Sequence, residues 1–282
     1  MASSTQAAMN ATLRRLEDKV AVITGGAAGL GEATARLFVR NGARVVIVDI
    51  DDEAGERLVT ELGDASARYV HCDVRKESDV AAAVTYAVST FGKLDIYFSN
   101  AGIYPTSRTS MDNLDMEDFD AVMATNLRGT VLSLKYAAKA MIPAKQGVII
   151  CTASIAGMLG GMTAASYAIS KAAIIAAVHC ASAELSQHGI RVNTISPFSV
   201  ATPLTLKSFR QVSLKPDLTW EELEEVIKKL NNQELAGSIL TPESVADAAL
   251  FLACSESAFM SGHNLVLDGG FSTRRGPAQY KL

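Results

Sequence analysis

The stretch that decides the fold is KVAVITGGAAGLGEATARLFVRNGARVVIVD, residues 19–49. Two apolar, β-branched runs, Lys19–Thr24 and Arg44–Asp49, read as buried strands. Between them lie a glycine-rich turn and a helical pattern that ends at Gly42. Strand, turn, helix and strand in this order predict a βαβ unit with a right-handed crossover.

The same alternation continues along the chain and predicts a single α/β domain. Five further strand-like runs occur at 67–74, 94–102, 147–154, 190–197 and 263–270, each separated from the next by a helical pattern. We therefore expect a Rossmann-type doubly wound domain, with a seven-stranded parallel sheet and helices on both faces. The domain should span 19–272, between a flexible N-terminal tail (1–18) and a C-terminal tail (273–282).

One connection is long, and its position predicts a substrate lid. About forty residues (198–239) separate the sixth strand from the next helix. They include a capping-box pattern, Thr219 with Glu222, that predicts a short helix. A long insertion at the carboxyl edge of a parallel sheet is where a lid over a ligand belongs.

Composition excludes several function classes. The chain has 282 residues and a net charge of −4, without the basic surface that nucleic-acid binding needs. Its four cysteines are far apart, so we expect reduced thiols, no metal site and a cytoplasmic location, with plastid targeting by the N-terminal segment as the minor alternative. The uncharged run 146–170 is interrupted by glycines, which argues against a membrane span.

The glycine turn has the features of a dinucleotide site. Gly25, Gly29 and Gly31 follow a strand and open a helix, whose free N–H groups suit a pyrophosphate. Their spacing differs from the common G-x-G-x-x-G pattern, and close helix packing is the alternative explanation. Asp49 ends the second strand, where a carboxylate accepts hydrogen bonds from an adenosine ribose and repels a 2′-phosphate. This favours NAD over NADP.

Further polar residues follow the next strands. Asp73 with Val74 is placed to reach an adenine, or it caps the following helix. The small residues Asn100–Gly102 let a cofactor approach the backbone. Asn126 falls inside a predicted helix, where asparagine is unfavourable, so it is either a satisfied core group or a site residue.

The segment SIAGMLGGMTAASYAISK, residues 154–171, carries the candidate chemistry. Tyr167 and Lys171 are four residues apart, so a helix places them on one face. A nearby ammonium favours the phenolate form of a tyrosine, which can then accept a proton from an alcohol. The alternative is a chance pair of exposed helix residues.

Together these motifs resemble the short-chain dehydrogenase/reductase family of the compact type. TGGAAGLG, Asp49, CDV, NAG, Asn126, Ser154, YAISK and ISPFSVATP occur in that family's order, from about Lys19 to Gly270. The segments SPFSVATPL and SGHNLVLDGGFS further resemble the corresponding segments of plant NAD-dependent secondary-alcohol dehydrogenases. Those enzymes act on lignans, monoterpenols such as borneol, and diterpenoids.

The resemblance implies a role for each matching residue. Tyr167 would be the acid/base, Lys171 would lower its pKa and hold the nicotinamide ribose, and Ser154 would orient the substrate oxygen. Asn126 would anchor a water relay, and Val200 with Thr202 would meet the carboxamide. The implied NAD-binding residues are Gly25, Gly29, Leu30, Gly31, Asp49, Ile50, Cys72, Asp73, Val74, Asn100, Ala101, Gly102, Tyr167, Lys171, Pro197, Val200 and Thr202.

Two positions depart from the family pattern. Ser99 stands where the family often has asparagine, and it precedes the cofactor-contacting residues. Phe198 stands where the family often has glycine, and it changes the shape of the site beside the nicotinamide.

We expect an apolar substrate pocket, because few charges fall among the residues after the catalytic strands and in the insertion. The predicted lining is Ile103, Tyr104, Ser154, Met158, Leu159, Phe198, Leu204, Leu206 and Phe209, about half of which should pack the lid instead.

The expected reaction is NAD-dependent oxidation of a hydrophobic secondary alcohol, with reduction of a hydrophobic ketone as the alternative direction. A non-catalytic nucleotide sensor is disfavoured by the complete set of catalytic residues. An epimerase or dehydratase of the extended type is disfavoured by the short chain after the last strand. The resemblance implies a homotetramer, or a homodimer, built on the two long apolar helices.

Overall fold

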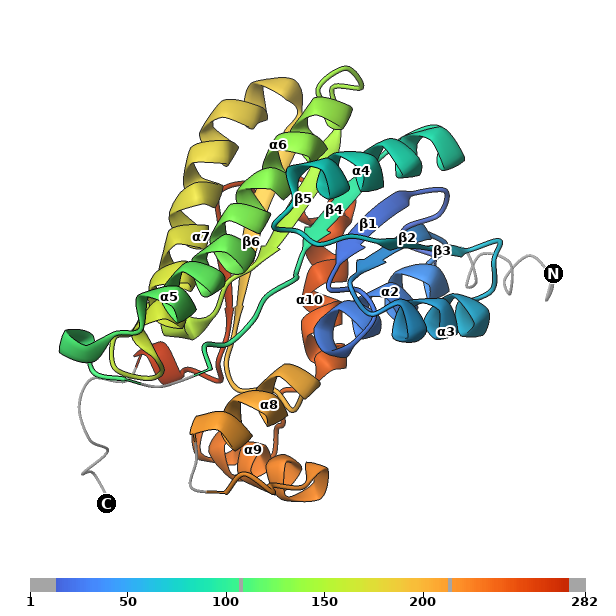
Figure 1. Cartoon of the computed structure of the whole chain (residues 1–282). Coiled ribbons are helices and arrows are strands. Elements are labelled where there is room, and N and C mark those ends of the chain that lie inside the picture. The colour runs from blue at the N-terminus through green and yellow to red at the C-terminus, as the bar shows by residue number, and fades with distance from the viewer. Residues whose placement is uncertain (1–13, 107–108, 213–214, 274–282) are drawn as a thin grey trace.

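A computed structural model describes residues 14–106, 109–212 and 215–273, and Figure 1 shows the chain. Its centre is a seven-stranded sheet in the order β3-β2-β1-β4-β5-β6-β7, and every neighbouring pair is parallel. The predicted doubly wound α/β fold is thereby confirmed. The strands are β1 (Val20–Thr24), β2 (Arg44–Asp49), β3 (Ala67–His71), β4 (Ile96–Ser99), β5 (Gly147–Thr152), β6 (Ile190–Pro197) and β7 (Asn264–Leu267).

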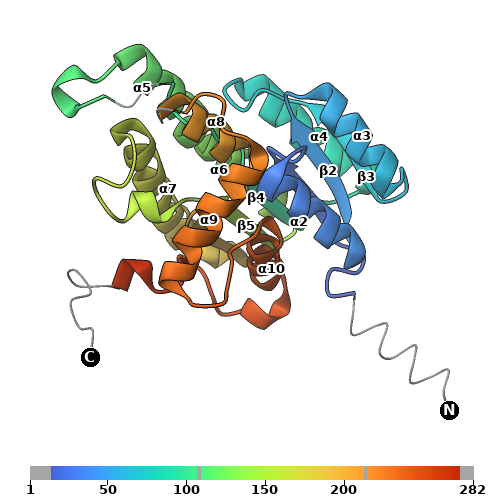
Figure 2. The same cartoon turned by 90° about the horizontal axis from the view of Figure 1, so that it is seen from below.

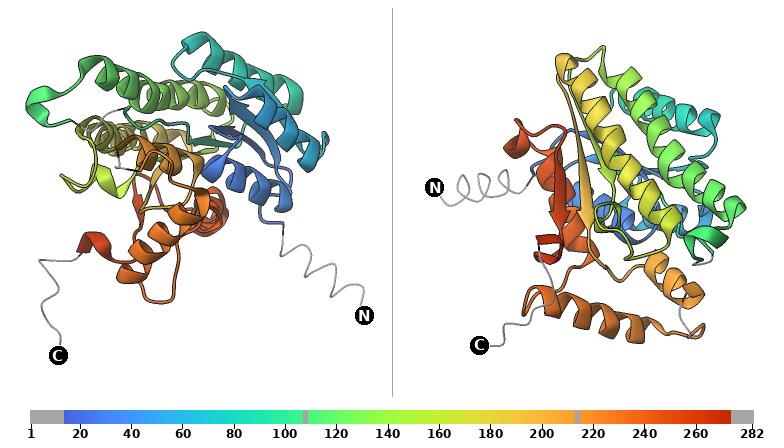
Figure 3. Two further views of the ribbon diagram at one scale, coloured as in Figure 1. Left: turned by 60° about the horizontal axis from the view of Figure 1, so that its bottom comes forward. Right: turned by 90° about the vertical axis from the view of Figure 1, so that its left-hand side faces the viewer.

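Helices cover both faces of the sheet (Figures 1 and 3). One layer contains α2 (Gly29–Arg40), α3 (Asp52–Leu62) and α10 (Pro242–Ala253), and the other contains α4 (Glu77–Phe91), α6 (Gly129–Met141) and α7 (Ala165–Leu185). Successive strand residues feed the two cores in turn, since Ile23 packs in the first layer and Val22 in the second. Burial of both faces explains why the central strands read as unbroken apolar runs.

The predicted helix that contains Asn126 is interrupted. It consists of α5 (Met116–Val122), a π-helical segment η2 (Met123–Arg128) and α6. Asn126 lies within η2, where its carbonyl accepts a 2.7 Å hydrogen bond from the Thr130 hydroxyl. A π-helical turn of this kind is frequent at functional sites.

Helix α7 and the turn after it, Ala165–His188, are long and apolar enough to cross a membrane by length and composition. Ile174, Val178 and Leu185 are nevertheless buried in the core beside the sheet. We therefore interpret α7 as a core helix of the domain.

The insertion after β6 contains two helices, α8 (Pro203–Val212) and α9 (Trp220–Glu234). The capping box of Thr219 and Glu222 at the start of α9 is confirmed, whereas α8 was not predicted. Leu218, Leu223 and Ile227 form a small separate core with α8. Viewed from below, the pair lies in front of β4 and β5 (Figure 2).

The start of the described chain is packed rather than loose. Leu16 is buried, and its amide donates to the carbonyl of Asn41 at 2.9 Å. The flexible tail expected over 1–18 therefore does not include 14–18, while 1–13 and the C-terminal residues 274–282 lie outside the described residues.

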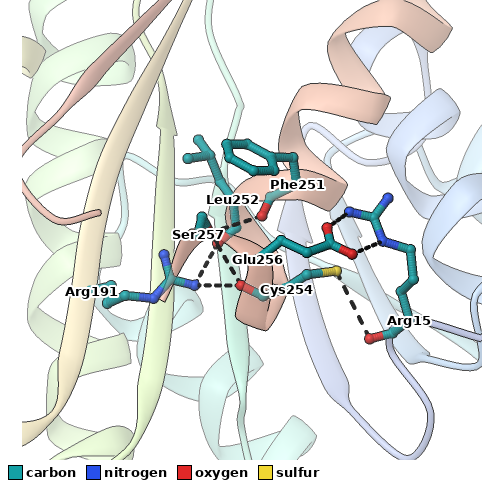
Figure 4. Close-up of polar contacts among 7 residues, drawn as sticks. All are labelled: Arg15, Arg191, Phe251, Leu252, Cys254, Glu256 and Ser257. Carbon is teal, nitrogen blue, oxygen red and sulfur yellow. Dashed lines mark hydrogen bonds and ion pairs between the residues drawn. The ribbon is translucent and has the colours of Figure 1, made fainter. Parts of the chain in front are cut away.

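A half-buried guanidinium caps the C-terminus of α10 (Figure 4). Arg191 of β6 donates to the carbonyls of Leu252 at 2.6 Å and Cys254 at 3.2 Å. Cations are favourable at a helix C-terminus, where the last carbonyls have no partner within the helix. Nearby, Arg15 pairs with Glu256 and joins the N-terminal segment to the same corner.

Arg191→Met should lower the free energy of unfolding by about 2–4 kcal/mol, because buried carbonyls would lose a charged donor. Arg57→Met, on the exposed face of α3, serves as the control and should change it by less than about 0.5 kcal/mol. Urea unfolding measures both. Equal stability of the two variants would contradict this role for Arg191.

Candidate active site

A cavity of about 500 Å³ opens at the carboxyl edge of the sheet, between the glycine turn and the insertion. It collects residues from distant parts of the chain. The predicted cofactor residues that line it are Gly25, Gly29, Leu30, Asp49, Ile50, Cys72, Asp73, Val74, Asn100, Ala101, Gly102, Tyr167, Lys171, Pro197, Val200 and Thr202.

The glycine turn has the shape that a pyrophosphate requires. Gly25 has φ +61°, and a Cβ there would stand 2.9 Å from the Ala101 Cα. Helix α2 begins without a side-chain cap at Ala28, so its first amides still need acceptors from outside the helix. The turn therefore fits a dinucleotide phosphate.

Gly31 lies outside the cavity lining, in contrast to its predicted role. A Cβ at Gly31 would collide with the carbonyl of Gly25. Close packing of the helix against the turn therefore explains this glycine.

Asp49 is fixed at the end of β2 by backbone amides. Its Oδ2 accepts from the amide of Ala27 at 3.1 Å, and its Oδ1 accepts from those of Ile50 at 2.8 Å and Asp51 at 3.2 Å. A carboxylate held by three amides keeps its position beside the cavity. It can accept further hydrogen bonds from a ribose, since each oxygen has two lone pairs.

Arg75 also lines the adenosine end of the cavity and was missed by the sequence analysis. Its guanidinium pairs with both carboxylate oxygens of Asp73, and this pairing is the main reason why the pKa of Asp73 is lowered. Asp73 therefore already has a partner at the place predicted to meet an adenine. Nothing in the spacing of the two residues indicated this pairing.

Ser154, Tyr167 and Lys171 meet at the other end of the cavity. Ser154 follows β5, where its hydroxyl accepts from the amide of Ala156 at 3.1 Å. Lys171 Nζ donates to the carbonyl of Thr152 at 2.8 Å and lies 5.5 Å from the centroid of the Tyr167 ring. Tyr167 and Lys171 are buried, so the pair is not an exposed chance pattern.

Burial dominates the electrostatics of this pair. Burial raises the pKa of Tyr167 well above its usual range, while a hydrogen bond with Ser154 partly opposes that rise. Burial also lowers the pKa of Lys171 to about 8. Lys171 thus does not bring the phenol into the neutral range in the protein alone, contrary to the expectation, because desolvation disfavours both charged forms.

Asn126 is fully buried and lies outside the cavity lining. Its Oδ1 accepts from the amide of Ile103 at 2.8 Å, and its Nδ2 donates to the carbonyl of Ile103 at 3.0 Å. The same Nδ2 donates to the hydroxyl of Ser170 at 3.1 Å, and that hydroxyl donates to the carbonyl of Tyr167. Asn126 therefore ties the loop after β4 to the catalytic helix.

The substrate end of the cavity is mostly apolar. Of the predicted pocket residues, Ile103, Tyr104, Ser154, Phe198, Leu204 and Phe209 line it. Ala156, Thr163 and Ser208, which were not predicted, also line it, together with Met162. The hydroxyl groups of Thr163 and Ser208 are therefore polar groups within an otherwise apolar lining.

Three predicted pocket residues do not line the cavity. Met158 and Leu159 follow the short helix η3 (Ile155–Gly157), which turns the chain outward, and the Met158 sulfur instead accepts from Asn264. Leu206 packs in the lid core with Leu218. Phe198 lines the cavity and stacks on Phe271, with ring centroids 4.9 Å apart.

Comparison with known proteins agrees with this geometry. The family model described as "Enoyl-(Acyl carrier protein) reductase", of the short-chain alcohol dehydrogenase type, matches residues 25–272. The chain is 45% identical to secoisolariciresinol dehydrogenase of Forsythia intermedia, over 96% of this chain and 95% of that protein. It is 46% identical to "Borneol dehydrogenase, mitochondrial" of Lavandula x intermedia, over 92% and 93%.

A solved structure supports the same assignment. The crystal structure of levodione reductase superposes with a TM-score of 0.83 at 31% identity, covering 93% of this chain and 100% of that chain. The sheet order, the glycine turn and the Ser154–Tyr167–Lys171 cluster therefore have a common explanation: the chain belongs to the short-chain dehydrogenase/reductase family of NAD(P)-dependent oxidoreductases.

Proposed function

We propose that the protein oxidises a hydrophobic secondary alcohol to a ketone with NAD⁺, in a reversible reaction. The observation that carries this proposal is the single cavity shared by the phosphate-binding turn and by Ser154, Tyr167 and Lys171. The supporting experiment is a panel of terpenoid, lignan and steroid alcohols offered with NAD⁺ or NADP⁺. Absorbance of the reduced cofactor reports turnover.

Ser154, Tyr167 and Lys171 have separate roles in the proposed reaction. The substrate hydroxyl lies between Ser154 and Tyr167, and the Tyr167 phenolate accepts its proton as the carbinol hydrogen leaves as hydride. Bound NAD⁺ supplies the hydride acceptor. Lys171 is anchored on the carbonyl of Thr152 and holds its ammonium beside the phenol ring.

The substrate class is inferred from the cavity wall. Ile103, Leu204 and Phe209 suit an apolar alcohol better than a sugar or a hydroxy acid. Two relatives are named for dehydrogenation of borneol and of secoisolariciresinol, a terpenoid and a lignan. We therefore propose a plant specialised metabolite of this kind as the substrate, and α8 and α9 as its lid.

Ketone reduction is the alternative direction, and one observation favours it. The raised pKa of Tyr167 keeps the phenol protonated at neutral pH, which is the form that donates a proton to a ketone. One relative in the solved structures is named as a reductase.

We also propose a homotetramer, or a homodimer, in which α7 packs against a second subunit. Ile169, Ala172 and Ala176 form an exposed apolar stripe on that helix, which supports the proposal. A cytoplasmic location is supported by four free cysteines, as in a reducing compartment.

Tyr167→Phe should lower kcat about 10³-fold, because the proton acceptor is lost while the ring shape remains. Binding of NADH, followed by its fluorescence, should not change. The control is Tyr136→Phe, which removes a hydroxyl that contacts Glu77 outside the cavity. Near-normal turnover by Tyr167→Phe with NAD⁺ bound would reject the acid/base assignment.

Oxidation and reduction should depend on pH in opposite ways. The rate of oxidation should rise with pH, about tenfold per pH unit below the pKa of Tyr167, because it needs the phenolate. Ketone reduction needs the phenol, so its rate should stay level through neutral pH and fall only in the alkaline range, since that pKa is raised. Initial rates in both directions test this, and parallel profiles would contradict it.

Asp49→Ser should weaken NADH binding about tenfold, because the ribose loses a charged acceptor. NADPH binding should improve, since the repulsion of its 2′-phosphate is removed. Glu53→Gln removes an exposed charge four residues away and serves as the matched control. Fluorescence titration with both cofactors measures the preference, and wild-type preference for NADPH would overturn the argument.

A further inference from the structure

The ring of Tyr104 stacks on the ring of Tyr167. The two centroids are 4.0 Å apart, and the ring planes differ by 17°. Both residues line the same cavity, and Tyr167 is 8% exposed. One face of the candidate acid/base is therefore covered by another aromatic ring.

The backbone around Tyr104 is held on both sides. The residue before it, Ile103, is bound through its N–H and its carbonyl by the side chain of Asn126. The residue after it, Pro105, is buried, and a residue before proline is confined to extended conformations. One position further on, the amide of Thr106 donates to the carboxylate of Asp118 at 2.9 and 3.0 Å.

The side chain of Tyr104 is held as well. The Thr163 hydroxyl donates to the phenol oxygen of Tyr104 at 2.9 Å. Thr163 precedes α7, the helix that carries Tyr167, so the two stacked rings are tied to the same element. Rotation of Tyr104 away from Tyr167 would break this hydrogen bond.

We propose that Tyr104 is a positioning residue for Tyr167, whose phenol it fixes in the cavity and shields from water on one face. Aromatic rings in offset stacks hold a defined separation and orientation, and a general base acts efficiently only within hydrogen-bonding reach of its proton. The substrate hydroxyl then reaches Tyr167 from the side that Tyr104 leaves open. This inference rests on the proposed function for its catalytic part and on the stack for its effect on the phenol.

The electrostatic consequence has a definite sign. Burial is the largest cause of the raised pKa of Tyr167, and proximity to Tyr104 adds to it. Removing the Tyr104 ring opens one face of the phenol to water, and hydration favours the phenolate. The pH at which Tyr167 ionises should therefore fall when the stack is lost.

Three variants separate positioning from simple packing. Tyr104→Ala removes the stack, Tyr104→Phe keeps the ring and removes the hydroxyl, and Phe209→Ala changes the cavity wall at a residue outside the stacked pair. With a hydrophobic alcohol and NAD⁺, Tyr104→Ala should lower kcat about tenfold. The pH at which the rate of oxidation rises should be about one pH unit lower than in wild type. Tyr104→Phe keeps the stacked ring and loses the hydrogen bond with Thr163, so its changes in kcat and in the pH profile should be smaller than those of Tyr104→Ala. Phe209→Ala should raise KM and leave the pH profile in place.

A second measurement does not depend on activity. Tyrosine labelled with ¹³C at Cζ reports the ionisation of each phenol by NMR, and Tyr167→Phe assigns the Tyr167 signal. The Tyr167 signal of Tyr104→Ala should titrate about one pH unit below that of wild type. Thermal unfolding of every variant shows that the fold persists.

The outcomes distinguish the two proposals. If wild type oxidises no alcohol with either cofactor, the proposed function fails, and the NMR titration still decides whether Tyr104 controls the phenol. If Tyr104→Ala is folded and both its pH profile and its Tyr167 titration match Phe209→Ala, Tyr104 is only part of the wall and the inference is overturned.

Discussion

The site depends on one amide, that of Asn100, which joins the carboxyl ends of three strands. Its Nδ2 donates to the carbonyls of Thr24 and Gly25, each at 3.2 Å, and its Oδ1 accepts from the Thr152 hydroxyl at 3.0 Å. These contacts bind the ends of β1, β4 and β5 at the place where the strand order reverses. Because the carbonyl of Thr152 also holds Lys171, this junction sets the spacing between the phosphate turn and the catalytic helix.

Burial then sets the chemistry at that junction. Desolvation shifts both groups toward their neutral forms, since it raises the pKa of Tyr167 and lowers that of Lys171 to about 8. The phenol is neutral beside an ammonium whose pKa lies close to neutral pH, so the protonation of the pair responds strongly to any charge that enters the cavity. A buried pair of this kind is poorly suited to act in the free protein. It is well suited to change state when a charged ligand is bound, because a low dielectric strengthens the interaction.

The fold could be predicted from sequence because its signals are local. Strands buried on both faces give continuous apolar runs, and glycines mark their turns, so the seven strands were found in order. The capping-box pattern that begins at Thr219 likewise predicted the helix α9. Contacts between particular side chains have no such signal, so the pairing of Arg75 with Asp73 and the stack of Tyr104 on Tyr167 were missed. Met158 was misplaced because a short helix after the strand redirects the chain.

An asparagine inside a helix can be a buried core group or a residue of the site, and Asn126 shows that one residue can be both. It is fully buried, and both hydrogens of its amide are engaged, one by Ile103 and one by Ser170. Its side chain therefore has no hydrogen left to donate to a water molecule, and a proton relay at this position would have to use a lone pair of its side-chain or main-chain oxygen. The π-helical turn places this amide between the loop of Tyr104 and the helix of Tyr167. A locally unfavourable residue is thus stabilised by joining the two elements whose alignment the chemistry requires.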